Sequence, residues 1–543
     1  MSINENERTL DPLLQRWVWV LIPLALSLLP FGNAIREGSM VGAGPDVISS
    51  VWAMWWFQQE WSSGAWGAHS TLFNFPWGGQ GAILSPMSAV VWSVFDGLLG
   101  PAWGTTVTTW LMLVGTMLGM VYLGQSFRLN KVALGAMMLM CLLPRYIVFT
   151  LGETGVVGIA MIPLLIGLSL IVQLEENDQL FRWILLVLMM GLQGVENPYL
   201  APVLPFAMIV QIIRLKKWRW FGFFLGGIAT MIVVVLLFRG ASGDYESVRP
   251  SSYTQLFGLY FPAIERPWAR TDWTDLVVPS SILWPAGSMD SIHIQGREYL
   301  GFSGLLIGIY ALRHRALRIW VLMAFMALVL TTGSDWNGAP SIFGLLNSIA
   351  DVLVRPFTQP SRYFVLYTIG MGVAVGRIIN RLDTKGVICW GILILESLLW
   401  GGLSLRMPTT PVPTSKCLSV EFDGPVLIWP WDGSDDQWFE SSLKSRLFQL
   451  QHEQSGATIA TGSWDLTGTV FPGKRLRDIG WRKAMDRQGK MKVSQLYDWG
   501  DRYVIVDETA GRVLSRTARD DVFGVANRIE DCADYDVYRL PKQ

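Results

Sequence analysis

Long apolar runs separated by short polar loops fill the first three quarters of the chain. As a helix, a run of about 20 apolar residues crosses the roughly 30 Å of bilayer hydrocarbon. Eleven runs approach that length, at 17–33, 105–124, 132–151, 155–173, 181–195, 199–213, 219–238, 299–312, 316–332, 362–377 and 386–404. The pattern predicts a mainly α membrane protein whose transmembrane domain spans residues 1–404.

The run at 82–100 differs from these eleven. It contains Pro86 and Asp96 and ends in a Gly-Pro pair. These features suit a segment at the membrane surface better than a lipid-facing span. We therefore predict an interfacial or re-entrant helix there.

The tail, residues 405–543, has the composition of a soluble domain. It holds 39 of the chain's 86 Asp, Glu, Lys and Arg residues, in about a quarter of the length. The stretches 425–430 (PVLIWP) and 503–507 (YVIVD) predict buried strands, and 434–454 predicts an amphipathic helix. The tail is therefore predicted to be an α/β domain.

Composition supports the membrane assignment and excludes other classes. Hydrophobic residues make up 51% and charged residues 16%, whereas soluble proteins average about 25% charged residues. The 43 basic and 43 acidic residues give no net charge, which argues against nucleic acid held on a general basic surface.

Basic residues in the short loops orient the spans. With 82–100 not counted as a crossing, the clusters fall on one side, which the positive-inside rule assigns to the cytoplasm. They are Arg8 and Arg16, Arg128 and Lys131, Arg182, residues 214–219 and 313–318, and Arg377, Arg381 and Lys385. A multi-pass cytoplasmic-membrane protein is predicted, with its N-terminus inside and its tail outside. The long loops 34–104, 239–298 and 333–361 are then also outside, where binding and chemistry are expected.

Asp46 stands out in the first outer loop. It follows Gly44-Pro45 and precedes VISSVWAMWWFQQEW, which predicts a Trp-rich amphipathic helix lying on the membrane. A carboxylate at a helix N-terminus is stabilised by the helix dipole, so it can act as an acceptor or base. Asp is also a favoured N-cap residue, which is the structural alternative.

Glu153 and Glu196 recur at the outer ends of predicted spans. Glu153 lies in a very short loop between the third and fourth runs, and Glu196 in the loop between the fifth and sixth. An acid held near hydrocarbon is costly unless paired, which makes both functional candidates. Solvation at the interface is the alternative for each.

Arginines on the predicted outer face are candidates for holding phosphate. Arg355 and Arg362 bracket the entrance to the tenth run, and Arg297 lies in the large outer loop. Guanidinium forks match phosphate geometry, and the positive-inside rule makes outer arginines less expected. Arg362 is the preferred anchor, with snorkelling to the headgroups as the alternative.

Other chemistry finds no sequence support. The four histidines show no metal-ligand spacing, so no metal site is predicted. Walker, GxSxG and dinucleotide motifs are absent. In the tail, Cys417 and Cys532 could form a disulfide in an oxidising compartment.

Several of these segments together resemble the GT-C membrane glycosyltransferases. They are the acid in Gly44-Pro45-Asp46, the stretch 73–78 (FNFPWG), Glu153, the segments 299–302 (YLGF) and 359–363 (QPSRY), and the tail strand in 499–507 (WGDRYVIVD). Neither an Asp-x-Asp pair in the first outer loop nor a WWDYG-like signature is present.

The resemblance implies transfer of a sugar from a polyprenyl-phosphate donor to a glycan, lipid or protein acceptor on the outer membrane face, with inversion expected. It assigns Asp46 as the base or acceptor-orienting carboxylate and Glu153 as a second acid that helps to place the acceptor or a divalent metal. Arg362, Arg355, Arg297 and Glu196 are then expected to bind substrate.

Two other classes stay open at this point. A transporter or flippase, or a glycan polymerase for lipid-linked saccharides, would place charges at mid-membrane, and Glu396 in the last run suits that reading. A non-catalytic scaffold is the third alternative.

Overall fold

The computed structural model describes thirteen stretches of the chain. They are residues 16–42, 45–63, 85–154, 161–197, 200–239, 299–331, 335–336, 339–340, 363–410, 426–429, 503–507, 528–531 and 535–539. The chain divides into two compact units. Unit 1 comprises Met1–Gly42, Thr105–Val235 and Ser251–Thr410, and unit 2 comprises Ala43–Gly104, Leu236–Pro250 and Pro411–Gln543.

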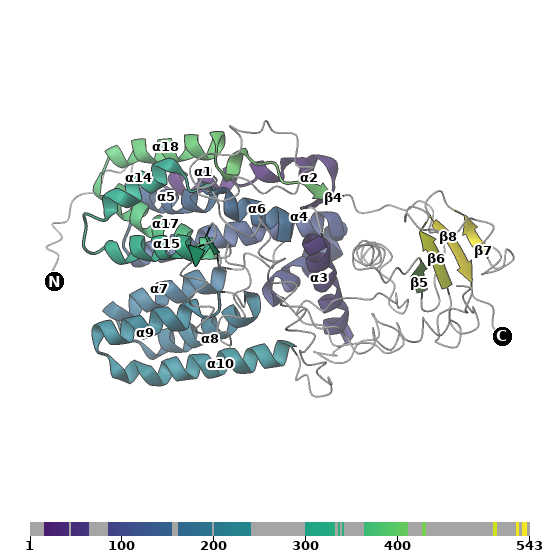
Figure 1. The fold of residues 1–543 in the computed structure, drawn as a ribbon, viewed down its shortest axis with the longest axis horizontal. Helices are drawn as coiled ribbons and strands as arrows, with labels where there is room; N and C mark the ends of the chain where they lie inside the picture. Colours follow the sequence, from purple (N-terminus) through teal and green to yellow (C-terminus); the bar gives the residue numbers. More distant parts are fainter. Residues whose placement is uncertain are drawn as a thin grey trace. The chain divides into compact units, whose positions relative to one another are not determined.

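Unit 1 is a helical bundle (Figure 1). Its helices are α1 (Val18–Leu26), η2 (Leu29–Phe31), α2 (Gly32–Glu37), α5 (Lys131–Leu142), α6 (Arg145–Thr154), α7 (Ile162–Glu176), α8 (Leu180–Glu196), α9 (Val203–Leu215), η4 (Trp218–Trp220), α10 (Phe221–Arg239), α14 (Phe302–Ala311), α15 (Arg318–Thr331), α17 (Phe364–Arg381), α18 (Lys385–Leu399) and η8 (Gly402–Ser404). Helix α4 (Pro86–Ser126) contributes its residues from Thr105 onward. Two short strand pairs complete it, β1 (Met40–Val41) with β4 (Thr409–Thr410), and β2 (Asp335–Trp336) with β3 (Ala339–Pro340).

Every one of the eleven predicted apolar runs contains a helix. Among the described residues, three segments are long and apolar enough to cross a membrane: Val18–Glu37, Pro86–Ser126 and Lys385–Ser404. The pair formed by α5 and α6, bent by 58°, would make a fourth. The full count of eleven spans stays a prediction.

The centre of the bundle is formed by α5 and α17. Each residue of α5 from Val132 to Leu142 is buried. Glycines on α17 let neighbouring helices approach closely, as in many membrane bundles. A Cβ on Gly370 would lie 2.5 Å from the backbone oxygen of Trp320 on α15, and one on Gly376 would lie 2.6 Å from Met137 on α5.

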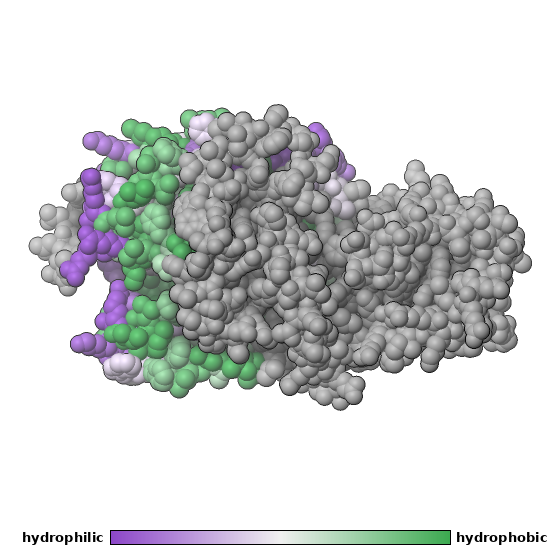
Figure 2. Space-filling model, in the orientation of Figure 1, coloured by the Kyte–Doolittle hydropathy of each residue, from purple (hydrophilic) through white to green (hydrophobic). Residues whose placement is uncertain are grey.

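Large apolar side chains cover the outside of this bundle. Figure 2 shows them as a band next to polar residues at one end. Soluble monomers rarely expose so continuous an apolar surface, which is typical of a lipid-facing belt. It includes Phe181, Ile184 and Leu188 on α8, Phe206 and Ile213 on α9, Leu225 and Ile232 on α10, Leu322 and Met326 on α15, and Ile388, Ile392 and Leu395 on α18.

The described residues of the predicted basic clusters lie together at one end of unit 1; Arg8 lies outside the described residues. Their contacts link one loop to the next around that end. Lys131 lies over the ring of Trp17, Arg128 pairs with Glu176, Arg214 pairs with Glu175, the backbone of Asn130 donates to Asn380, and the charge of Arg381 acts on His314. The predicted topology requires these loops to lie on one side of the membrane, and the structure brings them to one end of unit 1.

Helix α4 folds back on itself at one glycine. Gly100 has φ 78° and ψ 169°, a conformation outside the helical region. Four residues later, a Cβ on Gly104 would lie 2.9 Å from the backbone of Asp96, so the two parts of α4 pack backbone to backbone. The structure thus breaks α4 at Gly100, next to the end of the run 82–100, and the interfacial or re-entrant placement of that run stays a prediction.

Unit 2 contains α3 (Pro45–Ser63), the first part of α4 and a four-stranded sheet. The strands are β5 (Val426–Trp429), β6 (Tyr503–Asp507), β7 (Arg528–Asp531) and β8 (Tyr535–Arg539), in the order β5-β6-β8-β7. The predicted strands are β5 and β6, which pair in parallel. The predicted helix at 434–454, Cys417 and Cys532 lie outside the described residues, and the tail domain stays a prediction.

Candidate functional site

The end of unit 1 away from the basic loops is organised around Pro408. Gly42 donates its backbone N–H to the carbonyl oxygen of Pro408 at 2.7 Å, and Thr410 donates its hydroxyl back to the carbonyl of Gly42. Gly152 of α6 packs against the same proline, since a Cβ there would lie 3.3 Å from its Cδ. The segment that leads to Asp46 and the helix that carries Glu153 therefore meet at one residue.

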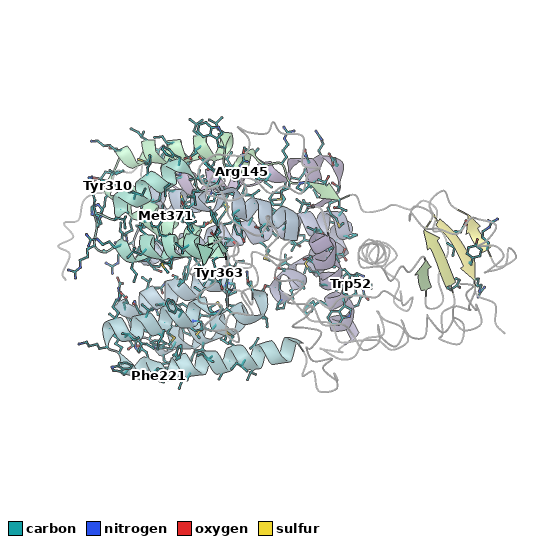
Figure 3. All side chains as sticks on the ribbon, viewed as in Figure 1. Trp52, Arg145, Phe221, Tyr310, Tyr363 and Met371 are labelled. Atoms are coloured by element: carbon teal, nitrogen blue, oxygen red, sulfur yellow. The ribbon has the colours of Figure 1, made fainter. Side chains whose placement is uncertain are left out.

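Asp46 is the second residue of α3, so it lies in the first helical turn. The sequence prediction of a helix beginning here is confirmed. Every side chain from Ser50 to Phe57 is buried, so this helix packs within protein, and its placement on the membrane surface stays a prediction. Tryptophans 52, 55 and 56 are packed inside the protein; Figure 3 labels Trp52.

Glu153 is the penultimate residue of α6, and not part of a short loop as the sequence predicts. Helix α6 begins after a break at Leu143-Pro144. Proline cannot donate the next helical hydrogen bond, which explains the break. The apolar run continues as a second helix that carries Glu153 to its end.

Glu196 is the last residue of α8, again helical where the sequence predicts a loop. Its side chain is fully buried. Gln193, one turn earlier, is equally buried, and its amide donates to the backbone oxygen of Asn197 at 3.4 Å. Three polar side chains are thus buried together at the end of α8. An acid in this setting is in protein and not in solvent at the interface.

The three candidate arginines, Arg297, Arg355 and Arg362, lie outside the described residues. The side chains of Asp46 and Glu153 are likewise not described. Their predicted roles stay predictions. Among the side chains that the structure does describe, no group of three His, Cys, Asp or Glu could hold a metal ion.

Sequence analysis missed Arg145, a buried arginine at the start of α6 (Figure 3). Its Nε donates to the backbone oxygen of Trp400 at 2.7 Å, and its Nη2 lies 3.3 Å from the hydroxyl of Ser404. The guanidinium therefore ties α6 to the end of α18 and to η8. A basic residue directly after a proline within an apolar run was the available signal.

Glu396 also has a role that its sequence position did not indicate. It lies on α18 with 5% of its surface exposed. Its carboxylate accepts hydrogen bonds from the hydroxyls of Tyr299 and Ser303 and from the backbone N–H groups of Phe302 and Ser303. Those N–H groups begin α14, where helices lack internal acceptors. Glu396 is thus a cap supplied by another helix.

Comparison with known proteins adds structural likeness. No protein-family model and no curated protein matches the chain. It is similar to arabinofuranosyltransferase AftD from mycobacteria (TM-score 0.47, 13% identity, 97% of this chain and 41% of that one). It is also similar to the oligosaccharyltransferase AglB from Archaeoglobus fulgidus, solved with an inhibitory peptide and a dolichol-phosphate (0.39, 11%, 90% and 69%).

A third similar structure is ArnT from Cupriavidus metallidurans bound to undecaprenyl phosphate (TM-score 0.39, 12% identity, 97% and 98% of the two chains). All three are GT-C glycosyltransferases, the class that the sequence motifs resemble. The chain spans less than half the length of AftD. The function proposed below therefore rests on the residues of this chain.

Proposed function

We propose that this protein transfers a sugar from a polyprenyl-phosphate donor to a glycan, lipid or protein acceptor on the outer face of the cytoplasmic membrane. Asp46 is the general base and Glu153 a second acid that places the acceptor or a divalent metal. Arg362, Arg355, Arg297 and Glu196 bind the substrates.

The meeting of two chain segments at Pro408 carries this proposal. Asp46 follows Gly42 by four residues, which bounds the separation of their Cα atoms to at most about 14 Å. Glu153 follows Gly152 directly. These short distances along the chain support the proposal that both acids serve one site near Pro408, at the end of unit 1 opposite the basic loops. Under the positive-inside rule that end is outside.

The surroundings suit a lipid-linked substrate. A polyprenyl-phosphate sugar has a polar head and a long apolar tail, so its enzyme needs a polar site next to a lipid-facing surface. Unit 1 has an apolar belt for the lipid, and the proposal puts the two acids at its outer end. A tail in lipid and a head beside Pro408 fit that arrangement.

In the proposed reaction the acceptor hydroxyl attacks the anomeric carbon of the sugar. The bond from that carbon to the lipid-phosphate oxygen breaks, and its electron pair leaves with the polyprenyl phosphate. Asp46 takes the hydroxyl proton, and the charge of Arg362 stabilises the departing phosphate. A single displacement of this kind inverts the anomeric configuration.

The transporter alternative loses its best candidate residue. Glu396 suggested a charge within the membrane on which ion coupling could depend. Its carboxylate is instead occupied by four donors at the start of α14. That arrangement favours a structural role for Glu396 and leaves the outer acids as the candidates for chemistry.

The experiment compares Asp46→Asn and Glu153→Gln in cells with Glu37→Gln as the matched control. Glu37 is an exposed acid whose carboxylate accepts from Thr409, next to Pro408. We expect Asp46→Asn to slow transfer about 10²- to 10⁴-fold, with the lipid donor accumulating and a surface sugar disappearing at equal protein level. Mass analysis of surface glycans and polyprenyl-phosphate sugars measures both.

The control should leave surface glycans unchanged. If Asp46→Asn leaves glycans and lipid-linked sugars at their normal levels, the proposed role of Asp46 is wrong. Altered movement of a lipid with unchanged glycans would favour the transporter.

A further inference from the structure

Two tight turns at the basic end of unit 1 carry an exposed group of five basic residues. Arg313 and Arg315 lie in the turn between α14 and α15, and Arg318 is the first residue of α15. At the second turn, Arg381 ends α17 and Lys385 begins α18. Backbone hydrogen bonds close both turns, from His314 to Ala311 at 2.9 Å in the first and from Lys385 to Leu382 at 3.0 Å in the second. We call these five residues the basic cluster.

A shared apolar core holds the two turns side by side. Ala311 and Leu317 flank the first turn and pack with Ala374 and Ile378 of α17. Leu312 and Leu382, one from each turn, pack against the same core. The proximity of the turns also appears in His314, whose pKa is lowered by burial and by the charge of Arg381. The cluster is thus a fixed surface feature, and not a set of unrelated loops.

The cluster differs from Arg128 and Arg214 at the same end, which pair with acids. Arg128 pairs with Glu176 at 3.2 Å and Arg214 pairs with Glu175. None of the five cluster residues forms an ion pair within the described part of the chain. Asp383, between Arg381 and Lys385, is the acid in this turn and offsets one of the five positive charges. A net positive charge therefore remains for an anion.

Two guanidinium groups in the cluster are held in place. Arg313 lies over the ring of Tyr310, with 5.3 Å between the guanidinium carbon and the ring centroid. Arg318 donates from Nε to the backbone oxygen of Leu312 at 2.9 Å. Preorganised guanidinium groups suit the planar, bidentate recognition of a phosphate.

Exposed apolar helix faces run away from the cluster. On α14 the exposed side chains include Leu306 and Ile309, with Tyr310 next to the cluster, and on α18 they include Ile388 and Ile392. In Figure 2 the polar end of unit 1 adjoins this apolar surface directly, and Figure 3 labels Tyr310 at that end. A ligand with an anionic head and apolar chains would match both surfaces at once.

We propose that the basic cluster binds the phosphate headgroup of an anionic phospholipid, whose acyl chains lie along the exposed faces of α14 and α18. This lipid is separate from the donor, which we place at the opposite end of unit 1. The chemistry that recognises it is phosphate charge beside hydrocarbon.

The test titrates the purified full-length protein in nonionic detergent with phosphatidylglycerol or phosphatidylcholine and counts bound lipid by native mass spectrometry. The variant Arg315→Gln/Arg381→Gln removes two cluster charges. Its matched control, Arg16→Gln/Lys216→Gln, removes two exposed charges at the same end but outside the cluster.

Each basic residue near an anionic lipid contributes about five-fold in affinity, so the cluster variant should bind phosphatidylglycerol about 30-fold more weakly. The control should bind it as the unmodified protein does. Arg315→Lys/Arg381→Lys, which keeps the charges, should retain most of the binding and shows that the substituted turns still fold.

Three results would overturn the proposal. Equal losses in the cluster and control variants would indicate diffuse attraction to net charge. Equal binding of phosphatidylcholine would remove the role of the anionic headgroup. Displacement of phosphatidylglycerol by millimolar inorganic phosphate would mean that the cluster recognises free phosphate and not a lipid.

Discussion

Removing the Glu396 carboxylate should open the start of α14. In Glu396→Ala the Ser303 N–H loses its acceptor. The Phe302 N–H keeps the Tyr299 hydroxyl, 3.3 Å away, as an acceptor, and the Tyr299 and Ser303 hydroxyls can rotate toward others. Each buried donor left without an acceptor costs about 1–3 kcal/mol. The Ser303 N–H alone therefore lowers the free energy of local opening by about 1–3 kcal/mol.

Hydrogen exchange measured by mass spectrometry on peptides from 299–311 reports this opening locally. A decrease of about 2 kcal/mol in the free energy of local opening accelerates hydrogen exchange about 30-fold. Glu396→Gln keeps one side-chain oxygen as an acceptor, so its acceleration should be smaller. Ser397→Ala is the control, because Ser397 is a buried neighbour on α18 whose hydroxyl bonds only within that helix, to Leu393.

Exchange in 299–311 that stays within about two-fold of the unmodified protein in Glu396→Ala would refute the capping argument. If such a variant also lost activity while remaining folded, Glu396 would be a functional charge. The transporter reading would then regain its support.

Three further predictions follow from packing and charge. Gly370→Ala places a Cβ against the rigid backbone of α15 and should lower the free energy of unfolding by about 1–3 kcal/mol. Its control, Gly391→Ala, has nothing within 4 Å of the added Cβ and should be neutral or slightly stabilising. Thermal unfolding in detergent distinguishes the two variants. Arg145→Met should destabilise by about 1–3 kcal/mol because it strands the backbone oxygen of Trp400, and proteolysis near residues 400–410 should accelerate in step. The pKa of His314 in the folded protein is below its ordinary value of 6.5, so protonation of His314 opposes folding. The stability of the protein should therefore fall as the pH drops through the range just below 6.5. His314→Gln should remove that part of the pH dependence, measured by thermal unfolding.

Sequence analysis located the helices because hydrophobicity alone marks a segment that leaves water. Each apolar run contains a helix, and strands β5 and β6 coincide with the predicted stretches. Element ends were less predictable. Glu153 and Glu196 extend their helices by a few residues, because polar residues continue a helix wherever surrounding protein shields the backbone, which no local pattern records.

The buried environment of α3 could not be predicted for a related reason. A Trp-rich helix has the same sequence pattern whether its rings lie at headgroups or pack inside protein. The difference depends on which segments surround it. Glu396 and Arg145 show the same limit, since their partners are 93 or more positions distant along the chain, although a charge within an apolar run marks a residue that needs a partner.

The fold-back at Gly100 has a consequence for anyone who maps this protein with reporter fusions. One residue with positive φ decides whether 86–126 counts as one crossing or as a surface segment followed by a crossing, and so the parity of all later spans. A substitution that straightened this hinge would join the two parts of α4 into one long helix, and later reporters alone would not locate that change. Fusions on both sides of Gly100 would therefore be more informative than any number placed after it.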